Sequence, residues 1–255
     1  MPTRTVVSRV VSTALAVAMG ISTLIAGLEH SSFLVGATGS GAVVAAVAAG
    51  ADRVVNSPDS AVATSSLDIS FDHPRIQQWV DRLSTTLKHD FANSMTRMDK
   101  YSDMITAKLD ARQMPRELIY LAMIESNFNP NARSHVGAVG MWQFMSATAR
   151  QFGLTVKGRT DERKDPVDAT DAALTYLSQL HKRFGSWYLA AAAYNSGAGT
   201  VSKALRKVTG KSQGTDEDFF RILSSLPRET QDYVPKLIAS ARVGTEMEKS
   251  ITNAD

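Results

Sequence analysis

The sequence of 255 residues is 44% hydrophobic, 21% charged and 7% aromatic, carries a formal net charge of +3, and contains no cysteine. These proportions are typical of a folded chain of one or two domains and exclude a wholly disordered or fibrous protein. The missing cysteine excludes disulfide scaffolds, cysteine-ligated zinc, iron–sulfur clusters, thiol catalysis and a lipid anchor on an N-terminal cysteine.

The N-terminal residues 1–51 have the layout of an export segment. Arg4 and Arg9 precede an uncharged, apolar run over residues 10–28, which is long enough to span a bilayer as a helix. A second uncharged stretch follows at 31–51. We therefore expect an exported protein, with residues 1–51 either cleaved as a signal or retained as an N-terminal membrane anchor; a buried core helix is the alternative.

Outside this segment the charges are close to balance, because residues 1–51 hold only Arg4, Arg9 and Glu29. No long basic run occurs, so nucleic acid is not an expected partner. Residues 52–66 are rich in Ser, Ala, Asp and Pro and predict a flexible linker. The folded part is expected to begin near Leu67.

The first folded segment shows helical periodicity. Asp72-His73-Pro74 predicts a helix start, with the acid as cap and the proline in the first turn. Apolar residues then recur at helical spacing at Ile76, Trp79, Val80, Leu83, Leu87, Phe91, Met95 and Met98. A further helix is expected at 100–109. Trp79 and the methionines are interpreted as core residues.

The rest of the chain is also predicted to be helical. Pro115 opens a strongly apolar helix that reaches Phe128 and is ended by Asn129-Pro130. Further helices are expected at 145–152, 166–184, 187–194, 199–207, 217–223 and 227–242. Asp165-Pro166 predicts a helix cap, and the charged run 161–168 a solvated loop and helix start instead of a metal site. With no alternating pattern typical of a strand pair, the predicted fold class is predominantly all-α.

Glu125 does not fit the apolar helix that carries it. It follows Leu121, Ala122 and Ile124 and precedes Phe128, so its side chain should emerge beside a hydrophobic wall. Desolvation there would raise the pKa of the carboxyl, which could then hold a proton near neutral pH and act as a general acid. The alternative is a surface glutamate in the last turn of a helix.

The segments around Glu125 resemble a known family. They are Ile124-Glu125-Ser126-Asn127-Phe128-Asn129-Pro130, Ser134, Gly137-Ala138-Val139-Gly140-Met141-Trp142-Gln143-Phe144-Met145 and Ala193-Tyr194-Asn195-Ser196-Gly197. In this order they resemble the lysozyme-like lytic transglycosylases of bacterial cell walls. Two further segments are similar to the membrane-bound transglycosylase D branch: the one from His73-Pro74-Arg75-Ile76-Gln77 through Met114-Pro115, and Leu226-Pro227-Arg228-Glu229-Thr230-Gln231-Asp232-Tyr233-Val234-Pro235.

The resemblance implies an organisation and a role for each matching residue. It implies a helical extension at 67–112 that packs on a lysozyme-like catalytic domain at 113–245, followed by a polar tail at 246–255. Glu125 would be the single catalytic acid and base. The substrate-binding residues would be Ser126, Ser134, Gln143, Met145, Tyr194, Asn195 and Tyr233. The two serines could equally be ordinary helix-end and loop residues, and Tyr233 a structural tyrosine.

The resemblance also implies the reaction: cleavage of the β-1,4 bond between N-acetylmuramic acid and N-acetylglucosamine, with a 1,6-anhydro ring as product and with no metal or cofactor. The expected partner is the peptidoglycan glycan strand, in the periplasm or cell envelope; a membrane tether through residues 1–51 and a link to a secretion or cell-wall machinery are left open. Two alternatives remain. One is a muramidase hydrolase, for which Asp161 or Glu162 is the candidate second carboxylate, and the other is an idle peptidoglycan-binding module.

Overall fold

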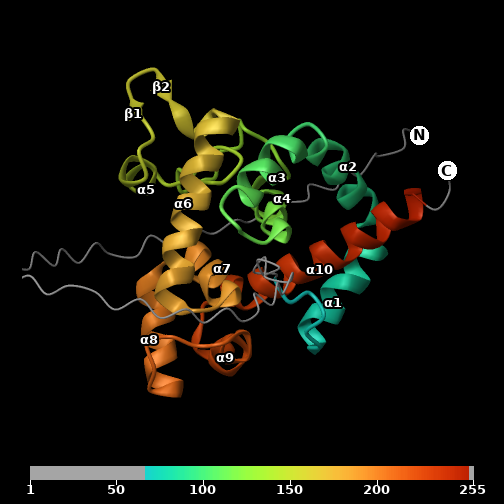
Figure 1. The fold of residues 1–255 in the computed structure, drawn as a ribbon, viewed down its shortest axis with the longest axis vertical. Coiled ribbons are helices and arrows are strands. Elements are labelled where there is room, and N and C mark those ends of the chain that lie inside the picture. The colour runs from blue at the N-terminus through green and yellow to red at the C-terminus, as the bar shows by residue number, and fades with distance from the viewer. Residues whose placement is uncertain (1–66, 253–255) are drawn as a thin grey trace, which may run out of the picture. The chain divides into compact units, whose positions relative to one another are not determined.

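Helices make up nearly all of the regular structure (Figure 1). The structure, a computed structural model, describes residues 67–252, which belong to one compact unit. The predicted export segment 1–51 and linker 52–66 lie outside the described residues. The elements in chain order are α1 (Pro74–Ser84), α2 (Lys88–Met98), α3 (Ser102–Asp110), η1 (Arg116–Leu118), α4 (Ile119–Ser126), α5 (Ser146–Gln151), β1 (Val156–Lys157), β2 (Thr160–Asp161), η2 (Glu162–Lys164), α6 (Pro166–Phe184), α7 (Trp187–Ser196), α8 (Ala198–Thr209), α9 (Asp216–Ile222), η3 (Leu223–Ser225) and α10 (Arg228–Thr252). The prediction of a predominantly α fold is confirmed.

The start of α1 differs from the prediction in its cap. The Nδ1 atom of His73 accepts a hydrogen bond from the Arg75 backbone N–H at 3.2 Å, so His73 and not Asp72 is the capping residue. Pro74 is the first helical residue, where its missing N–H costs nothing. The apolar stripe predicted as continuous is divided between two helices, because the backbone leaves the helical conformation at Thr85.

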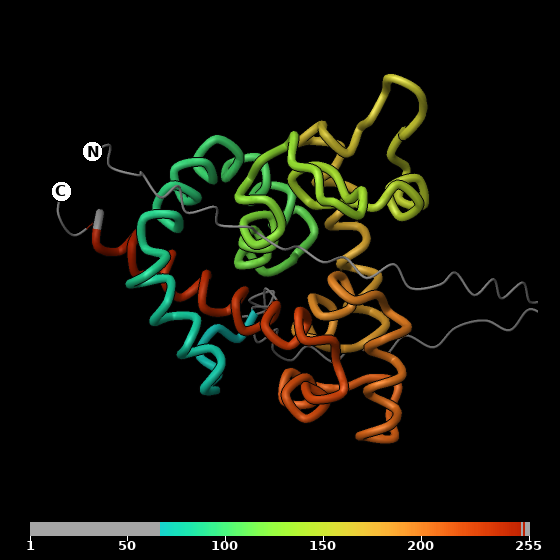
Figure 2. The backbone as a smooth tube through the Cα atoms, turned by 180° about the vertical axis from the view of Figure 1, so that it is seen from behind, coloured from blue at the N-terminus to red at the C-terminus, as the bar shows by residue number. Residues whose placement is uncertain are grey.

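Helix α1 lies alongside the C-terminal helix α10, and both views show the two helices side by side (Figures 1 and 2). The Arg75 guanidinium joins them by donating to the Asp232 carboxylate at 2.8 Å. α10 extends to Thr252, well beyond the predicted end at 242, so part of the predicted polar tail is helical. The polar side chains of this last part are exposed, as in Glu246 and Lys249.

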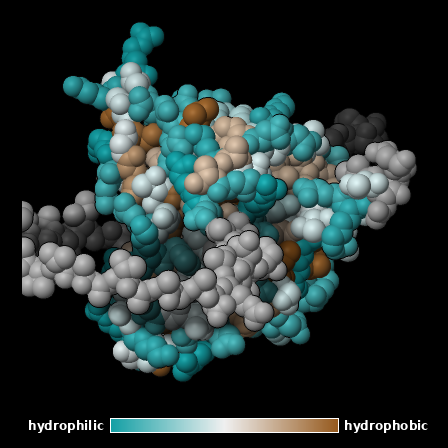
Figure 3. Space-filling model, in the orientation of Figure 1, coloured by the Kyte–Doolittle hydropathy of each residue, from teal (hydrophilic) through white to brown (hydrophobic). Residues whose placement is uncertain are grey.

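Helix α7 lies in the core. Its residues from Trp187 to Ala193 are all buried, because a run of alanines lets the surrounding helices approach closely. It contacts α6, α8, α9 and α10. Hydrophilic side chains cover most of the described surface in the view of Figure 3. No helix within residues 67–252 has both the length and the apolar character needed to cross a bilayer.

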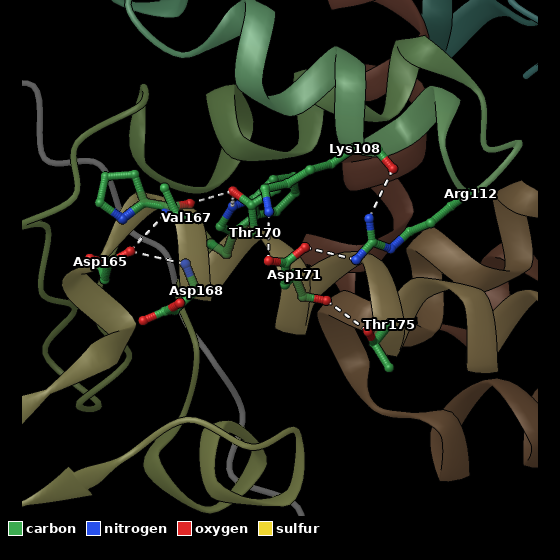
Figure 4. A network of polar contacts seen from close by, with 10 residues as sticks. Lys108, Arg112, Asp165, Val167, Asp168, Thr170, Asp171 and Thr175 are labelled. Carbon is green, nitrogen blue, oxygen red and sulfur yellow. Dashed lines mark hydrogen bonds and ion pairs between the residues drawn. The ribbon is translucent and has the colours of Figure 1, made fainter.

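A polar network fastens α3 and the long helix α6 together (Figure 4). Asp171 of α6 accepts from the Lys108 ammonium at 2.6 Å and from the Arg112 guanidinium at 2.7 Å. At the start of α6, the Asp165 carboxylate accepts from two backbone N–H groups, which confirms the predicted cap. The indole of Trp142 donates to the Thr170 hydroxyl at 2.9 Å and so ties the preceding loop to the same helix.

The loop before α5 is held by a buried arginine. Arg163 is only 4% exposed; its guanidinium donates to the carbonyl oxygens of Gly137 at 3.1 Å and Phe144 at 3.0 Å and pairs with Asp161. The prediction that the run 161–168 is a solvated loop is therefore wrong at Arg163. The same region forms a two-residue antiparallel hairpin, β1 with β2, which is too short to leave a pattern in the sequence.

Gly140 is expected to be the most sensitive glycine of this loop. Its φ is +90°, and a Cβ atom there would lie 1.7 Å from the Arg163 carbonyl oxygen, which is backbone and cannot move aside easily. Gly140→Ala should lower the free energy of unfolding by about 3 kcal/mol or more, measured by urea denaturation followed by circular dichroism.

The control is Gly137→Ala. Gly137 has nearly the same φ, +88°, but a Cβ atom would meet nothing within 4 Å. It should cost only the strain of the left-handed backbone, about 1–2 kcal/mol. Equal losses for the two variants would contradict the role assigned to the close approach of Gly140 to Arg163.

Candidate functional site

Helix α4 brings Glu125 to the edge of the core. The first residues of the helix, Ile119 to Met123, are all buried, and Glu125 stands in the last turn with part of its surface exposed. The helix ends at Ser126, two residues earlier than predicted, because Asn127 takes the left-handed conformation with φ +52°. Phe128 follows with φ +59° and is 1% exposed, so burial of its ring holds this unfavourable backbone.

The end of α4 is also tied to α2. The Arg97 guanidinium donates to the Asn127 carbonyl oxygen at 2.7 Å, and the Ser94 hydroxyl donates to the Asn127 side-chain oxygen at 3.0 Å. These contacts fix the turn that follows Glu125. A turn fixed in this way holds the Glu125 carboxyl in a defined position, as a site that binds a ligand requires.

Glu125 has the properties of a general acid. The pKa of its carboxyl is raised from 4.5 to about 7, and burial is the largest cause. A hydrogen bond from the Tyr233 hydroxyl, 2.6 Å from Glu125 Oε1, works in the opposite direction. The negative charge of Glu229 also raises the pKa and the positive charge of Lys236 lowers it; the value of about 7 is the net result of these effects. The balance keeps this carboxyl half-protonated near neutral pH, where it can both give and take a proton.

The three side chains that act on Glu125 come from one face of α10. Glu229, Tyr233 and Lys236 are spaced by four and three residues, which places them above one another on a helix. Burial and the charge of Glu125 raise the pKa of Tyr233 well above its usual value, so its hydroxyl stays a neutral donor. α10 thus presents an anion, a hydroxyl and a cation toward a single carboxyl.

Tyr194 and Asn195 lie at the C-terminal end of α7. The Tyr194 hydroxyl donates to the Trp142 carbonyl oxygen at 2.8 Å, and burial, together with the charge of Glu125, raises the pKa of Tyr194 well above its usual value. The Asn195 amide donates to Glu229 Oε1 at 3.2 Å and accepts from the Thr230 hydroxyl at 2.8 Å. Asn195 therefore holds the start of α10, including Glu229, in place.

The other predicted site residues make local contacts. The Ser126 hydroxyl donates to the Met141 carbonyl oxygen at 2.8 Å, and the Ser134 hydroxyl accepts from the Ala138 N–H at 3.0 Å. Gln143, with φ +48°, donates from its side chain to the Gly140 carbonyl oxygen at 2.7 Å. Met145 precedes α5 and is partly exposed. These contacts shape the loop, and the roles of these residues toward a substrate stay predictions.

The second carboxylate near Glu125 is not one that was predicted. Asp161 is occupied by the buried Arg163, and Glu162 accepts from the Thr155 N–H at 2.6 Å, so neither is directed at Glu125. The carboxylate whose charge acts on Glu125 is Glu229, which also accepts a hydrogen bond from Asn195. It lies four residues before Tyr233 and shares a helix face with it, but this spacing alone does not identify a partner elsewhere in the fold.

The region around this site is similar to known proteins. Residues 103–216, which include Glu125, match the model of the transglycosylase SLT domain. The chain is a homologue of membrane-bound lytic murein transglycosylase D of Escherichia coli strain K12, with 42% identity over 144 residues. The resemblance drawn from the sequence motifs is confirmed.

The similarity covers only part of each protein. The match to the Escherichia coli enzyme spans 56% of this chain and 31% of that protein. The peptidoglycan transglycosylase gp16 of Escherichia phage T7 is 33% identical over 145 residues, which are 56% of this chain and 10% of that protein. Among solved structures, an inactive variant of lytic transglycosylase Slt from Pseudomonas aeruginosa superposes with a TM-score of 0.46 at 28% identity, covering 56% of this chain and 24% of that one.

Proposed function

We propose that this protein is a lytic transglycosylase that cleaves peptidoglycan between N-acetylmuramic acid and N-acetylglucosamine, with Glu125 as the single acid and base. The observation that carries the proposal is the carboxyl of Glu125, held half-protonated near neutral pH beside the Tyr233 hydroxyl within an SLT domain. The chain covers about a third of the length of its Escherichia coli homologue, and the proposal concerns this part.

One carboxyl group can serve both steps of this reaction. Protonated Glu125 gives its proton to the glycosidic oxygen as the bond from that oxygen to C1 breaks. The carboxylate so formed, which accepts the Tyr233 hydrogen bond, then takes the proton of the muramyl C6 hydroxyl as that oxygen bonds to C1. The 1,6-anhydro ring closes, Glu125 regains its proton, and no water is consumed. The attacking hydroxyl belongs to the same sugar, which gives a large advantage in effective concentration.

The remaining predicted residues are assigned to substrate binding within this proposal. Ser126, Ser134, Gln143 and Met145 lie on or next to the segment that follows α4, and Tyr194 and Asn195 at the end of α7. The substrate, peptidoglycan, supports a location in the cell envelope, in keeping with the export segment predicted at 1–51. Retention of that segment as a membrane tether and a link to a secretion machinery stay predictions from the sequence.

The product tests the proposal. Digestion of purified sacculi should release muropeptides that end in 1,6-anhydromuramic acid, and mass spectrometry detects these as 18 Da lighter than the reducing-end form, the mass of the water that is not added. Glu229 favours one alternative, since a second carboxylate near the acid could activate a water. Reducing-end muramic acid as the main product would establish this muramidase reaction and refute the transglycosylase.

A further inference from the structure

Two cationic side chains lie over the ring of Trp79 in α1. The guanidinium carbon of Arg82 lies 4.3 Å from the ring centroid, and the ammonium nitrogen of Lys236 lies 5.5 Å from it. Both distances are within the range of attraction between a cation and an aromatic face. Arg82 is exposed, whereas Trp79 and Lys236 are partly buried. Of the two cations, Lys236 is the one directed into the protein.

Lys236 stands on the same face of α10 as Tyr233, whose hydroxyl touches Glu125. The charged groups that face Lys236 are Glu125 from α4 and Arg82 from α1. Burial lowers the pKa of the lysine, the nearby Glu125 raises it, and Arg82 lowers it. A partly desolvated ammonium needs compensating interactions. The Trp79 ring, 5.5 Å away, supplies one, and the charge of Glu125 supplies a longer-range attraction.

α1 therefore reaches the site through Lys236, whose ammonium lies over the Trp79 ring and which stands three residues beyond Tyr233, on the face of α10 that contacts Glu125. α1 lies outside the part of the chain that matches the SLT domain, residues 103–216, and so does Lys236. The extension was expected only to pack on the catalytic domain, and Trp79 to be a core residue. The Trp79 ring does pack against the core, but it also lies against the Lys236 ammonium, whose charge acts on Glu125.

We propose that Trp79 is a positioning residue of the catalytic site: its ring holds the Lys236 ammonium on the face of α10 from which Tyr233 contacts Glu125, and thereby sets how readily Glu125 releases its proton. This inference rests on the proposed function, in which Glu125 is the acid and base. Lys236 favours the carboxylate form, which must appear when the glycosidic bond breaks. Glu229 opposes it, so the two charged groups of α10 act on the pKa of Glu125 in opposite directions.

The direct test measures the titration of Glu125 by NMR. The protein is labelled with carbon-13 at the side-chain carboxyl of its glutamates, and the signal that is absent in Glu125→Gln is assigned to Glu125. Lys236→Met should raise the pKa of Glu125 by about half a unit or more, because a nearby positive charge is lost. Trp79→Leu should raise it in the same direction, and Trp79→Phe, which keeps an aromatic face, should leave it near the wild-type value. Glu229→Gln serves as a control of opposite sign, since loss of the negative charge lowers the pKa.

The double variant Trp79→Leu/Lys236→Met decides whether Trp79 acts through Lys236. It should show no larger shift than Lys236→Met alone. A lowered pKa in Trp79→Leu would mean that water has entered a loosened site, and an equal additional shift in the double variant would mean that Trp79 acts independently of the lysine; either result overturns the proposal. Because the titration needs no turnover, it can fail or succeed independently of the transglycosylase activity.

Discussion

Glu125→Gln is expected to abolish release of anhydromuropeptides from sacculi, with a loss of at least about 10³-fold in turnover. Glutamine keeps the shape of the side chain and an oxygen that can accept from Tyr233, but it has no proton to give to the glycosidic oxygen. The measurement is the rate of product release at pH 6 to 7, followed by chromatography and mass spectrometry.

The same substitution should stabilise the folded protein above neutral pH. The pKa of Glu125 is raised on folding from 4.5 to about 7, so the folded state binds the proton more tightly, and stability falls as pH rises through this window. Glutamine removes this penalty, so the variant should gain a few kcal/mol at most at pH 8 and nothing near pH 4. Higher stability together with lost activity would separate a functional carboxyl from a structural one.

The matched control is Glu117→Gln, which neutralises another glutamate just before α4, in η1. It should retain wild-type turnover. If Glu125→Gln kept more than a tenth of the activity, the assignment of the acid would be refuted. If neither the wild type nor the variant cleaved glycan while both bound sacculi, the protein would be a peptidoglycan-binding module without catalysis.

Tyr233→Phe is expected to reduce turnover by about 10- to 100-fold. The hydroxyl donates to the carboxyl at 2.6 Å, and a hydrogen bond to a charged group contributes about 1.5–3 kcal/mol. Its loss destabilises the carboxylate that forms when the glycosidic oxygen is protonated. The hydrogen bond also lowers the pKa of Glu125, so in the variant that pKa rises.

The pH profile separates this effect from general damage to the fold. The alkaline limb of the activity profile reports loss of the acid's proton, and in Tyr233→Phe it should move to higher pH. The control Tyr188→Phe removes a hydroxyl that donates to the Asp68 carbonyl oxygen, near the opposite end of α7 from Asn195. It should leave both turnover and profile unchanged. A Tyr233→Phe profile that dropped in height without moving would contradict the hydrogen bond as the cause.

Most helices could be predicted from the sequence because their signals are local. α6 has the predicted bounds, 166–184, since Asp165 caps one end and Gly185 takes the left-handed conformation at the other. The break at Thr85 was missed because the apolar stripe continues across it. The early end of α4 was also missed, because Asn127 and Phe128 take positive φ angles that only the surrounding contacts can hold.

The site was predictable to a lesser extent. Glu125 stood out because it interrupts an apolar helix, and Tyr233 belonged to a motif. The contact between them joins residues 108 positions apart, and no local pattern specifies such a pairing. Glu229 and Lys236 were missed for the same reason, because a charge on a helix surface is ordinary until its partner is known. The burial of Arg163 likewise depends on carbonyl groups that a distant loop presents.

The position of α10 has a consequence for how such a protein can change. Glu125, the proposed acid, lies inside the part that matches the SLT domain, but the hydroxyl and the charged groups that adjust its pKa lie on a helix beyond residue 216. If the protein acts as proposed, substitutions at Glu229 or Lys236 would therefore shift its working pH toward acid or alkali while every residue of the matched domain stays the same. In this architecture the chemistry and its adjustment to the environment are encoded in separate parts of the chain.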